Sequence, residues 1–197
     1  MANYYKTPPE GYKEYKVIDA TNKKVGLTLN LVALILTVGL MVGLYFLLLA
    51  GYTFLLNDLI VFFIVMVVGY VLYIITHELL HGLAYKLLTK QKLTFGLTLT
   101  VAFCGLKEGY VNKKTALISI LAPFVVHSIW MIPTMLLLPK GGLLLAIIFL
   151  FASHFGGCVG DFYGTITLLK APSDVLMCDT GPKQTFLSKT YATQNNQ

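Results

Sequence analysis

The sequence predicts a mainly α integral membrane protein, in which four transmembrane helices carry a short β-hairpin between the second and the third. Composition is the first observation behind this class. Hydrophobic residues make up 56% of the 197 residues and charged residues only 12%, whereas soluble domains carry about 25% charged residues. The second observation is that the apolar residues gather in long uncharged runs, as they do in membrane-spanning helices. The third is one segment with a period of two, which is typical of a strand.

Each uncharged run is long enough to cross a hydrocarbon layer of about 30 Å at about 1.5 Å per residue. In the first run, Gly39 and Gly43 have the G-x-x-x-G spacing. This spacing either permits close helix packing or reflects the ordinary glycine content of membrane helices. Several glycines in the last run favour close contact or local unwinding. The predicted spans are residues 27–50, 59–88, 115–138 and 143–169.

The segment from residue 93 to residue 104 departs from the helical pattern. Its alternate residues are apolar, and threonine, glycine or alanine stand between them. This period predicts a strand, which we expect to be half of a hairpin that returns near Tyr110 and Val111. Because an open strand in lipid would leave backbone groups without hydrogen bonds, the strand should lie at the interface or against protein that lines a cavity.

The polar ends of the chain are predicted to be tails around a four-helix membrane domain that spans residues 25–170. The tails are residues 1–24 and 171–197, and a small hairpin is expected in the second tail around Asp179–Pro182. Every basic residue is a lysine, and all except Lys140 lie before the first span, in the segment from Lys86 to Lys114 or from Lys170 onward. By the positive-inside rule, this distribution predicts a multi-pass protein of the cell membrane with both termini in the cytoplasm.

Charge, cysteine usage and the first apolar run exclude three other classes. The net charge of +6 comes from lysines that flank apolar runs, so it reflects topology and no nucleic-acid partner is expected. The cysteines Cys104, Cys158 and Cys178 are odd in number and have no C-x-x-C spacing. We therefore expect neither a disulfide framework nor a cysteine zinc site. The apolar run that begins near Leu27 is too long for the core of a cleavable signal and should stay in the membrane.

The most specific motif is His77-Glu78-Leu79-Leu80-His81-Gly82, which continues from the second apolar run. On a helix, residues four apart share a face, so His77 and His81 can offer two imidazole nitrogens to one metal ion. Glu78 falls close to the same face, where its carboxylate could take a proton from a water molecule. This H-E-x-x-H pattern is that of zinc-dependent hydrolases. The alternative, two histidines that bond to neighbouring helices, leaves Glu78 buried without a partner.

A catalytic zinc ion needs a third protein ligand and an open position. Asp161 is the preferred candidate because its depth of about 12 Å from the cytoplasmic end of its helix matches the depths of about 14 and 8 Å estimated for His77 and His81. His154 is the alternative third ligand. It lies about 10 Å from Asp161 on a straight helix, too far for both residues to bind one ion. His127 is expected to lie at a different depth in the membrane from His77 and His81.

The motif on a membrane helix, followed by a late Gly-Asp, resembles the site-2 protease type of intramembrane zinc metalloprotease. More closely, the chain is similar to a bacterial group of small four-helix membrane proteins classed as zincin peptidases. That group typically shows the zinc motif, a strand-like segment ending near a cysteine, a Leu-Ala-Pro stretch and the Gly-Asp. The last three would be Cys104, Leu121-Ala122-Pro123 and Gly160-Asp161, so the resemblance covers most of residues 59–170. The longer Asn-Pro-Asp-Gly or Leu-Asp-Gly form of site-2 proteases is absent.

The resemblance implies a zinc-dependent endopeptidase. One catalytic zinc ion would be held by His77, His81 and Asp161, and Glu78 would act as general base and then as general acid. The substrate would be a membrane protein or peptide that is cut within the bilayer or next to it, near the cytoplasmic face. The rival class is a non-catalytic zinc-binding membrane protein, such as a pseudoprotease, an immunity factor or a binding factor.

The predicted strand suggests how a substrate could be held. A peptide bond inside a helix is shielded, so the substrate must be unwound, and the strand could keep it extended by adding it to a sheet edge. Leu97, Leu99 and Val101 are the candidate substrate-binding residues. The lipid bilayer is the other expected partner, and the sequence does not indicate an oligomeric state.

Overall fold

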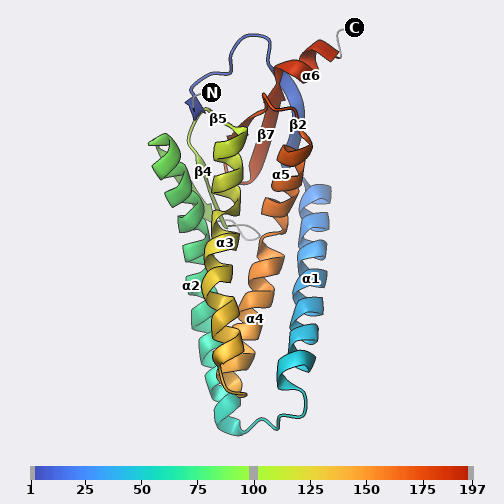
Figure 1. Ribbon diagram of the computed structural model, residues 1–197, viewed down its shortest axis with the longest axis vertical. Coiled ribbons are helices and arrows are strands. Elements are labelled where there is room, and N and C mark those ends of the chain that lie inside the picture. The colour runs from blue at the N-terminus through green and yellow to red at the C-terminus, as the bar shows by residue number, and fades with distance from the viewer. Residues whose placement is uncertain (1–2, 98–101, 195–197) are drawn as a thin grey trace. The chain divides into compact units, whose positions relative to one another are not determined.

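The computed structural model describes residues 3–97 and 102–194 and divides into two compact units. Unit 1 comprises Met1–Thr28, Glu78–Pro123 and Gly160–Gln197, and unit 2 comprises Leu29–His77 and Phe124–Val159. Helices α1, α2 and α3 each have one part in each unit. The elements drawn in Figure 1 are, in chain order, β1 (Tyr4–Tyr5), β2 (Lys13–Asp19), α1 (Lys23–Leu49), α2 (Leu56–Thr89), β3 (Leu93–Leu97), β4 (Ala102–Leu106), β5 (Tyr110–Asn112), α3 (Lys113–Leu137), α4 (Gly142–Gly157), α5 (Val159–Lys170), β6 (Leu176–Asp179), β7 (Lys183–Ser188) and α6 (Lys189–Gln194).

Three of the helices, α1, α2 and α3, are long and apolar enough to cross a membrane, and the number rises to four if the bent pair α4 and α5 counts as one span. The mainly helical class predicted from the sequence is therefore confirmed, and the helices suggest association with a membrane. The predicted fourth span, residues 143–169, is not one helix. α4 ends at Gly157 and α5 begins at Val159, so the break falls among the glycines that favour unwinding.

The segments predicted as polar tails contain four strands of unit 1. Strands β1 and β2 come from the first tail and β6 and β7 from the second, and with β5 they form a sheet in the order β1-β5-β6-β7-β2. All its pairs are antiparallel. β6 and β7 form the hairpin expected around Asp179–Pro182, with Asp179 opposite Gln184. A local pattern misses the rest of the sheet because each strand is short and its partner is distant, as for Val17 of β2 and Thr185 of β7.

Strands β3 and β4 pair with each other in a separate two-stranded sheet of unit 1. The structure thus differs from the single strand predicted over residues 93–104, because residues 93–97 and 102–106 are two strands that pair antiparallel. The return strand expected near Tyr110 is β5, which pairs with β1 and β6 in the other sheet. Leu97 is the last residue of β3, whereas Leu99 and Val101 lie outside the described residues.

The core of unit 1 forms where parts of α2, α3 and α5 meet the strands. Tyr85 of α2 is fully buried there, and its hydroxyl donates a hydrogen bond to Asp179 of β6 at 2.7 Å. α3 starts behind an N-cap, since the Asn112 side-chain oxygen accepts a hydrogen bond from the Thr115 backbone N–H at 2.8 Å. The other buried members of this core are Ile18, Leu106, Val111, Ala116, Ile120, Leu168, Ala171, Val175, Met177 and Phe186.

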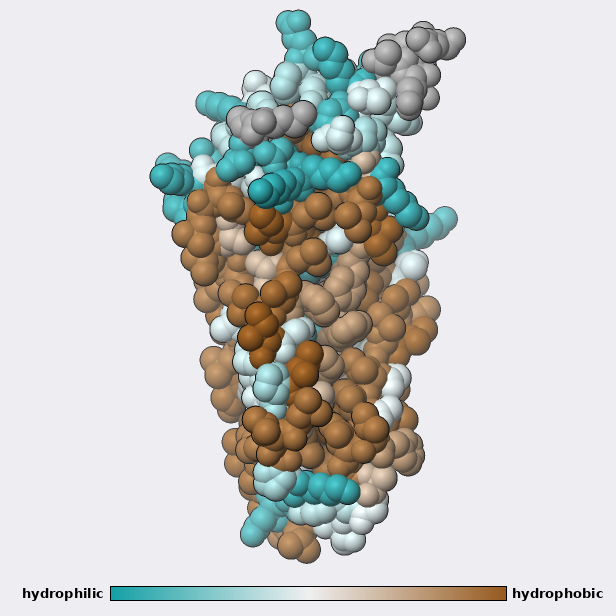
Figure 2. All heavy atoms as spheres, in the orientation of Figure 1, coloured by the Kyte–Doolittle hydropathy of each residue, from teal (hydrophilic) through white to brown (hydrophobic). Residues whose placement is uncertain are grey.

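Unit 2 consists of helices and their connections. Asp58 of α2 accepts a hydrogen bond from the Gly142 backbone N–H at 2.9 Å, so a carboxylate caps the first turn of α4, where the helix dipole favours negative charge. Large apolar side chains remain exposed along its helices, for example Leu47 and Ile64, and Figure 2 shows apolar side chains gathered over the helices on the visible face. An apolar surface of this extent suits contact with lipid. The buried core consists of Leu49, Tyr73, Met131, Met135, Leu144, Ile147, Ile148, Leu150 and Phe151.

The glycines of α1 and α4 differ in whether another helix packs against them. A Cβ placed on Gly39 or Gly43 would meet no described atom within 4 Å, so the G-x-x-x-G spacing marks no helix contact among the described residues. A Cβ on Gly156 would instead overlap the Thr37 hydroxyl and lie 2.7 Å from the Ala33 carbonyl oxygen. The close approach of α1 and α4 thus depends on a glycine of α4.

Candidate metal centre

Helix α2 carries the H-E-x-x-H motif across the boundary between the units. His77 is the last residue of this helix in unit 2, and Glu78 is the first in unit 1. Because α2 is continuous here, the helical repeat itself puts His77 and His81 on one face. The two imidazoles are buried, at 7% and 8% exposed, whereas Glu78 is partly exposed.

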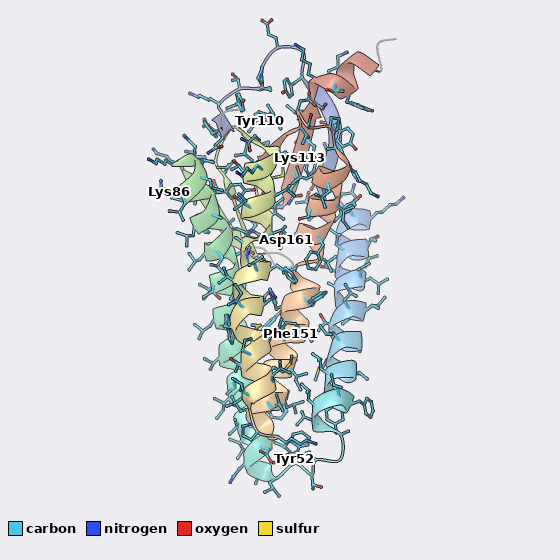
Figure 3. The ribbon with its side chains drawn as sticks, in the orientation of Figure 1. Tyr52, Lys86, Tyr110, Lys113, Phe151 and Asp161 are labelled. Atoms are coloured by element: carbon cyan, nitrogen blue, oxygen red, sulfur yellow. The ribbon has the colours of Figure 1, made fainter. Side chains whose placement is uncertain are left out.

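Two contacts within unit 1 hold the imidazole of His81. Its Nδ1 lies 2.9 Å from the backbone carbonyl oxygen of Ser119 in α3. Since a carbonyl oxygen only accepts, Nδ1–H is the donor, and in the neutral ring Nε2 then keeps its lone pair. This Nε2 lies 3.4 Å from Oδ1 of Asp161. Asp161 stands in the first turn of α5 (Figure 3), where the helix dipole favours a carboxylate.

The pair formed by His81 and Asp161 fits a zinc ion. Two ligand atoms bound to tetrahedral zinc at about 2.0–2.2 Å lie about 3.3–3.6 Å apart, and the separation here is 3.4 Å. An imidazole nitrogen and a carboxylate oxygen are both common zinc ligands. The Ser119 carbonyl is the kind of second partner that orients a metal-binding histidine. A direct ion pair has a similar distance, so the preference for a metal depends on this whole arrangement and not on the distance alone.

Within unit 2, His77 contacts Tyr73, which is the central residue of a histidine cluster. The Tyr73 hydroxyl oxygen lies 3.1 Å from Nδ1 of His77. The Tyr73 ring also has its centroid 5.5, 5.2 and 5.6 Å from those of His77, His127 and His154, respectively. The alternative third ligand, His154, therefore lies in the same cluster as His77. Cys158 joins it, with one ligand atom each of His77, His154 and Cys158 within 4.8 Å of one another.

His127 has the contacts of a structural histidine. Its Nδ1 accepts a hydrogen bond from the Trp130 indole N–H at 3.1 Å, so the proton of the neutral ring sits on Nε2. Nε2 lies 3.4 Å from the Thr76 hydroxyl oxygen. Both ring nitrogens of His127 thus contact neighbouring side chains, and among the described residues His127 belongs to neither group of potential metal ligands.

The β3–β4 hairpin packs directly against the motif. A Cβ on Gly82 would lie 2.7 Å from the Phe95 ring and 3.1 Å from the Cys104 sulfur, so a larger residue here would displace these side chains of the hairpin. Burial, with the nearby charges of Glu78 and Asp179, raises the pKa of Cys104 to about 12. The Cys104 thiol is therefore neutral, and Glu78 lies close to β4.

Sequence analysis did not identify Tyr73, Ser119 or Cys158 as parts of this region. Two of them had a local signal, since Tyr73 precedes His77 by four residues and Cys158 follows His154 by four residues. This is the spacing that puts side chains on one helix face. Ser119 contributes a backbone carbonyl, which any residue type offers, so its contact with His81 had no sequence signal.

A family model described as "Putative zincin peptidase" matches residues 69–176, more than half of the chain. The matched segment begins before the motif and ends after α5, so it includes His77, Glu78, His81 and Asp161. No curated protein and no solved structure is significantly similar to the chain.

Proposed function

The chain belongs to the zincin peptidase family, and from this membership we propose that it is a zinc-dependent endopeptidase that cuts membrane proteins within the bilayer or next to it. The observation that carries the proposal is the contact between Nε2 of His81 and Oδ1 of Asp161 at 3.4 Å. Glu78 stands less than one turn before His81 on the same helix. A membrane-spanning helix with these groups resembles the site-2 protease type.

The proposed ligands of one zinc ion are His77, His81 and Asp161. The Ser119 carbonyl keeps the proton of His81 on Nδ1, and a proton on Nδ1 of His77 would be donated to the Tyr73 oxygen. In the imidazoles of both His77 and His81, Nε2 is then the nitrogen that would bind the zinc ion. A zinc ion held by these residues would supply a Lewis acid for polarising the scissile carbonyl and for making water more acidic.

Glu78 is the proposed general base and general acid. Its carboxylate takes a proton from the attacking water and delivers it to the leaving amine, the two transfers that peptide hydrolysis requires. Because Glu78 is partly exposed while the two motif histidines are buried, it is the member of the motif best placed to exchange protons with water.

Strand β3 is the proposed docking edge for the substrate. The Lys107 N–H donates to the Lys92 carbonyl at 3.1 Å, so these residues form a hydrogen-bonded pair of the antiparallel ladder. Hydrogen-bonded and non-hydrogen-bonded pairs alternate, and the backbone groups of Leu93, Phe95 and Leu97 therefore point away from β4. No described strand occupies this edge. An extended substrate could pair there, beside the motif that Phe95 contacts through Gly82.

The proposed setting is the cell membrane, with the lysine-rich unit 1 and both termini on the cytoplasmic side. Every lysine except Lys140 belongs to unit 1, which is the distribution expected of the cytoplasmic side. Cleavage would then occur near the cytoplasmic face, and the lipid bilayer would surround the exposed apolar side chains of the helices.

The decisive variant is Glu78→Gln, which keeps the size of the side chain and removes its basicity. We expect peptide cleavage to fall about 100- to 10,000-fold, the usual contribution of general acid–base catalysis, while zinc content stays that of the parent. Cleavage is measured as new N-termini of co-expressed membrane proteins by mass spectrometry, and zinc by elemental analysis of the purified protein. Glu108→Gln, the same change at an exposed residue, is the matched control. Equal processing by Glu78→Gln and parent would leave the non-catalytic zinc-binding class.

The docking edge is tested by Leu97→Pro. Proline removes a backbone N–H that points away from β4, so the hairpin keeps its internal hydrogen bonds while the edge loses a donor. We expect processing of membrane substrates to fall at least tenfold with zinc content unchanged. Leu97→Ala, which shortens the side chain and keeps the N–H, separates a side-chain effect from a backbone effect. Full processing by Leu97→Pro would exclude pairing at this edge.

A further inference from the structure

Four polar side-chain atoms of unit 2 lie close together around Tyr73. The Tyr73 oxygen lies 3.1 Å from His77 Nδ1 and 3.4 Å from His154 Nδ1. Cys158 Sγ lies 3.7 Å from that same nitrogen of His154. His154 and Cys158 are fully buried, and Tyr73 and His77 nearly so. This cluster lies in the interior of unit 2 and includes only one residue of the zinc set proposed above.

Two of the spacings within this cluster are those of ligands around one tetrahedral metal ion. Bonds of about 2.0–2.3 Å to nitrogen, oxygen and sulfur put ligand atoms about 3.3–3.8 Å apart, and the separations that involve His154 are 3.4 and 3.7 Å. The 3.1 Å between Tyr73 and His77 is a hydrogen-bond distance, and one ligand atom each of His77, His154 and Cys158 lie within 4.8 Å of one another. Tyr73 and His77 stand one turn apart on α2. His154 lies on α4, and Cys158, four residues later, directly follows the end of that helix. Such four-residue spacing is how helices build metal sites.

We propose that His77, His154 and Cys158, with Tyr73 as the fourth neighbour, form a second metal position in unit 2. A thiolate with two imidazoles favours soft or borderline ions such as Cd²⁺, Cu⁺ or Zn²⁺ over Mg²⁺ or Ca²⁺. The set that contains His81 and Asp161 has a carboxylate in place of the thiolate and is the harder of the two. The second position therefore favours softer ions than the catalytic set does.

His77 belongs to both positions, and this step rests on the proposed function. A neutral imidazole has one nitrogen lone pair, so His77 binds one ion at a time. Its Nδ1 faces Tyr73 and the second position, and its Nε2 is the nitrogen proposed for catalytic zinc. A soft ion in unit 2 withdraws His77 from the catalytic set and thereby inhibits the enzyme.

Cadmium titration of the full-length protein in detergent tests the second position without any assay of cleavage. A Cd²⁺–thiolate bond gives an ultraviolet charge-transfer absorption, and we expect one equivalent of Cd²⁺ to produce it in the parent. The absorption should persist in His81→Ala and Asp161→Ala, which remove the proposed catalytic set. It should disappear in Cys158→Ser, which is nearly isosteric, and weaken at least tenfold in affinity in His154→Ala. Cys104→Ser and Cys178→Ser are the matched controls and should keep it.

Three results would overturn this inference: no absorption in the parent, absorption that persists in Cys158→Ser, or absorption that disappears in Cys104→Ser or Cys178→Ser. Circular dichroism of each variant shows that its helices are retained. Binding of two Cd²⁺ ions by the parent chain would refute the sharing of His77. If Glu78→Gln cleaves as well as the parent, the proposed enzyme is refuted while the absorption result stands, so the two failures are distinguishable.

Discussion

Unit 1 and unit 2 share three helices but differ in what surrounds these helices. Unit 1 holds the described strands of both sheets and every lysine except Lys140, and its core combines helices with a sheet. Unit 2 is helical, and three of the four histidines cluster in its interior around Tyr73. Unit 1 thus resembles the core of a soluble domain, and unit 2 resembles a helix bundle whose outer surface contacts lipid.

The motif helix α2 passes from one environment into the other between His77 and Glu78. Glu78, the proposed general base, and His81 and Asp161, two of the proposed zinc ligands, belong to the lysine-rich unit that carries the sheets. His77 belongs to the apolar unit. A hydrolase that acts on membrane proteins needs both environments, because peptide hydrolysis consumes water while the substrate arrives from lipid. We infer that unit 1 supplies Glu78 and two of the three proposed zinc ligands, and that unit 2 supplies His77 and an apolar surface suited to lipid.

The largest expected effect concerns Asp161 of unit 1, the proposed third ligand. Asp161→Ala, made in the Cys158→Ala background so that unit 2 offers no thiolate, should weaken zinc binding by more than about 100-fold. That exceeds the 10- to 100-fold typical of partners that only orient a ligand. Zinc affinity is measured by competition with a chelating dye.

The control for this measurement is Thr165→Ala, one turn further along α5, which should bind zinc as the background protein does. Retained zinc affinity in the Asp161 variant, with loss in His154→Ala, would move the third ligand into unit 2 and break the assignment of chemistry to unit 1.

An intermediate effect concerns the ionisable pair in the core of unit 1. Burial raises the pKa of Asp179 to about 6, although hydrogen bonds from Tyr85 and the Gly181 N–H oppose the rise. The folded state therefore holds this proton more tightly than the unfolded chain does. The resulting stability is complete below about pH 4 and is lost as the pH rises through about 6, by at most about 3 kcal/mol.

Asp179→Asn should remove this pH dependence. The amide oxygen can still accept the Tyr85 hydrogen bond, but the side chain has no proton to lose. Thermal unfolding of parent and variant between pH 4 and pH 7 should therefore show the parent losing stability relative to the variant. If the stabilities of parent and variant changed with pH in parallel, burial would not raise the pKa of Asp179. The environment of Asp179 in the core of unit 1 would then resemble that of a solvent-exposed carboxylate.

The smallest effect concerns helix packing in unit 2. A Cβ on Gly156 would overlap the Thr37 hydroxyl and press on the Ala33 carbonyl, so Gly156→Ala should lower the free energy of unfolding by about 1–3 kcal/mol. The matched change Gly39→Ala, on a helix face with no described neighbour within 4 Å, should leave the protein no less stable. Chemical denaturation in one detergent compares the two variants. If Gly156→Ala were as stable as Gly39→Ala, the close contact between α1 and α4 would be contradicted.

Local pattern was enough to predict the long helices, and it also identified the residues of the motif. Hydrophobic runs and the spacing of His77 and His81 depend on residues that are near one another in the chain, where helix geometry alone decides which side chains meet. The depth argument likewise selected Asp161 from a counted rise per residue. The contact between Asp161 and His81 at 3.4 Å agrees with that choice of partner, while the ligand role itself stays a prediction.

Only the tertiary structure decided how the distant pieces of the chain combine. The polar ends form strands because each finds a partner far along the chain, as Val17 does opposite Thr185, and no local period marks such short strands. The Tyr73 hydroxyl and Nδ1 of His154 meet across a separation of 81 residues. The sequence by itself determined a membrane protein with a zinc-type motif on its second long helix. Folding determined what surrounds that motif, because contacts between distant residues depend on packing and not on the order of residues along one helix.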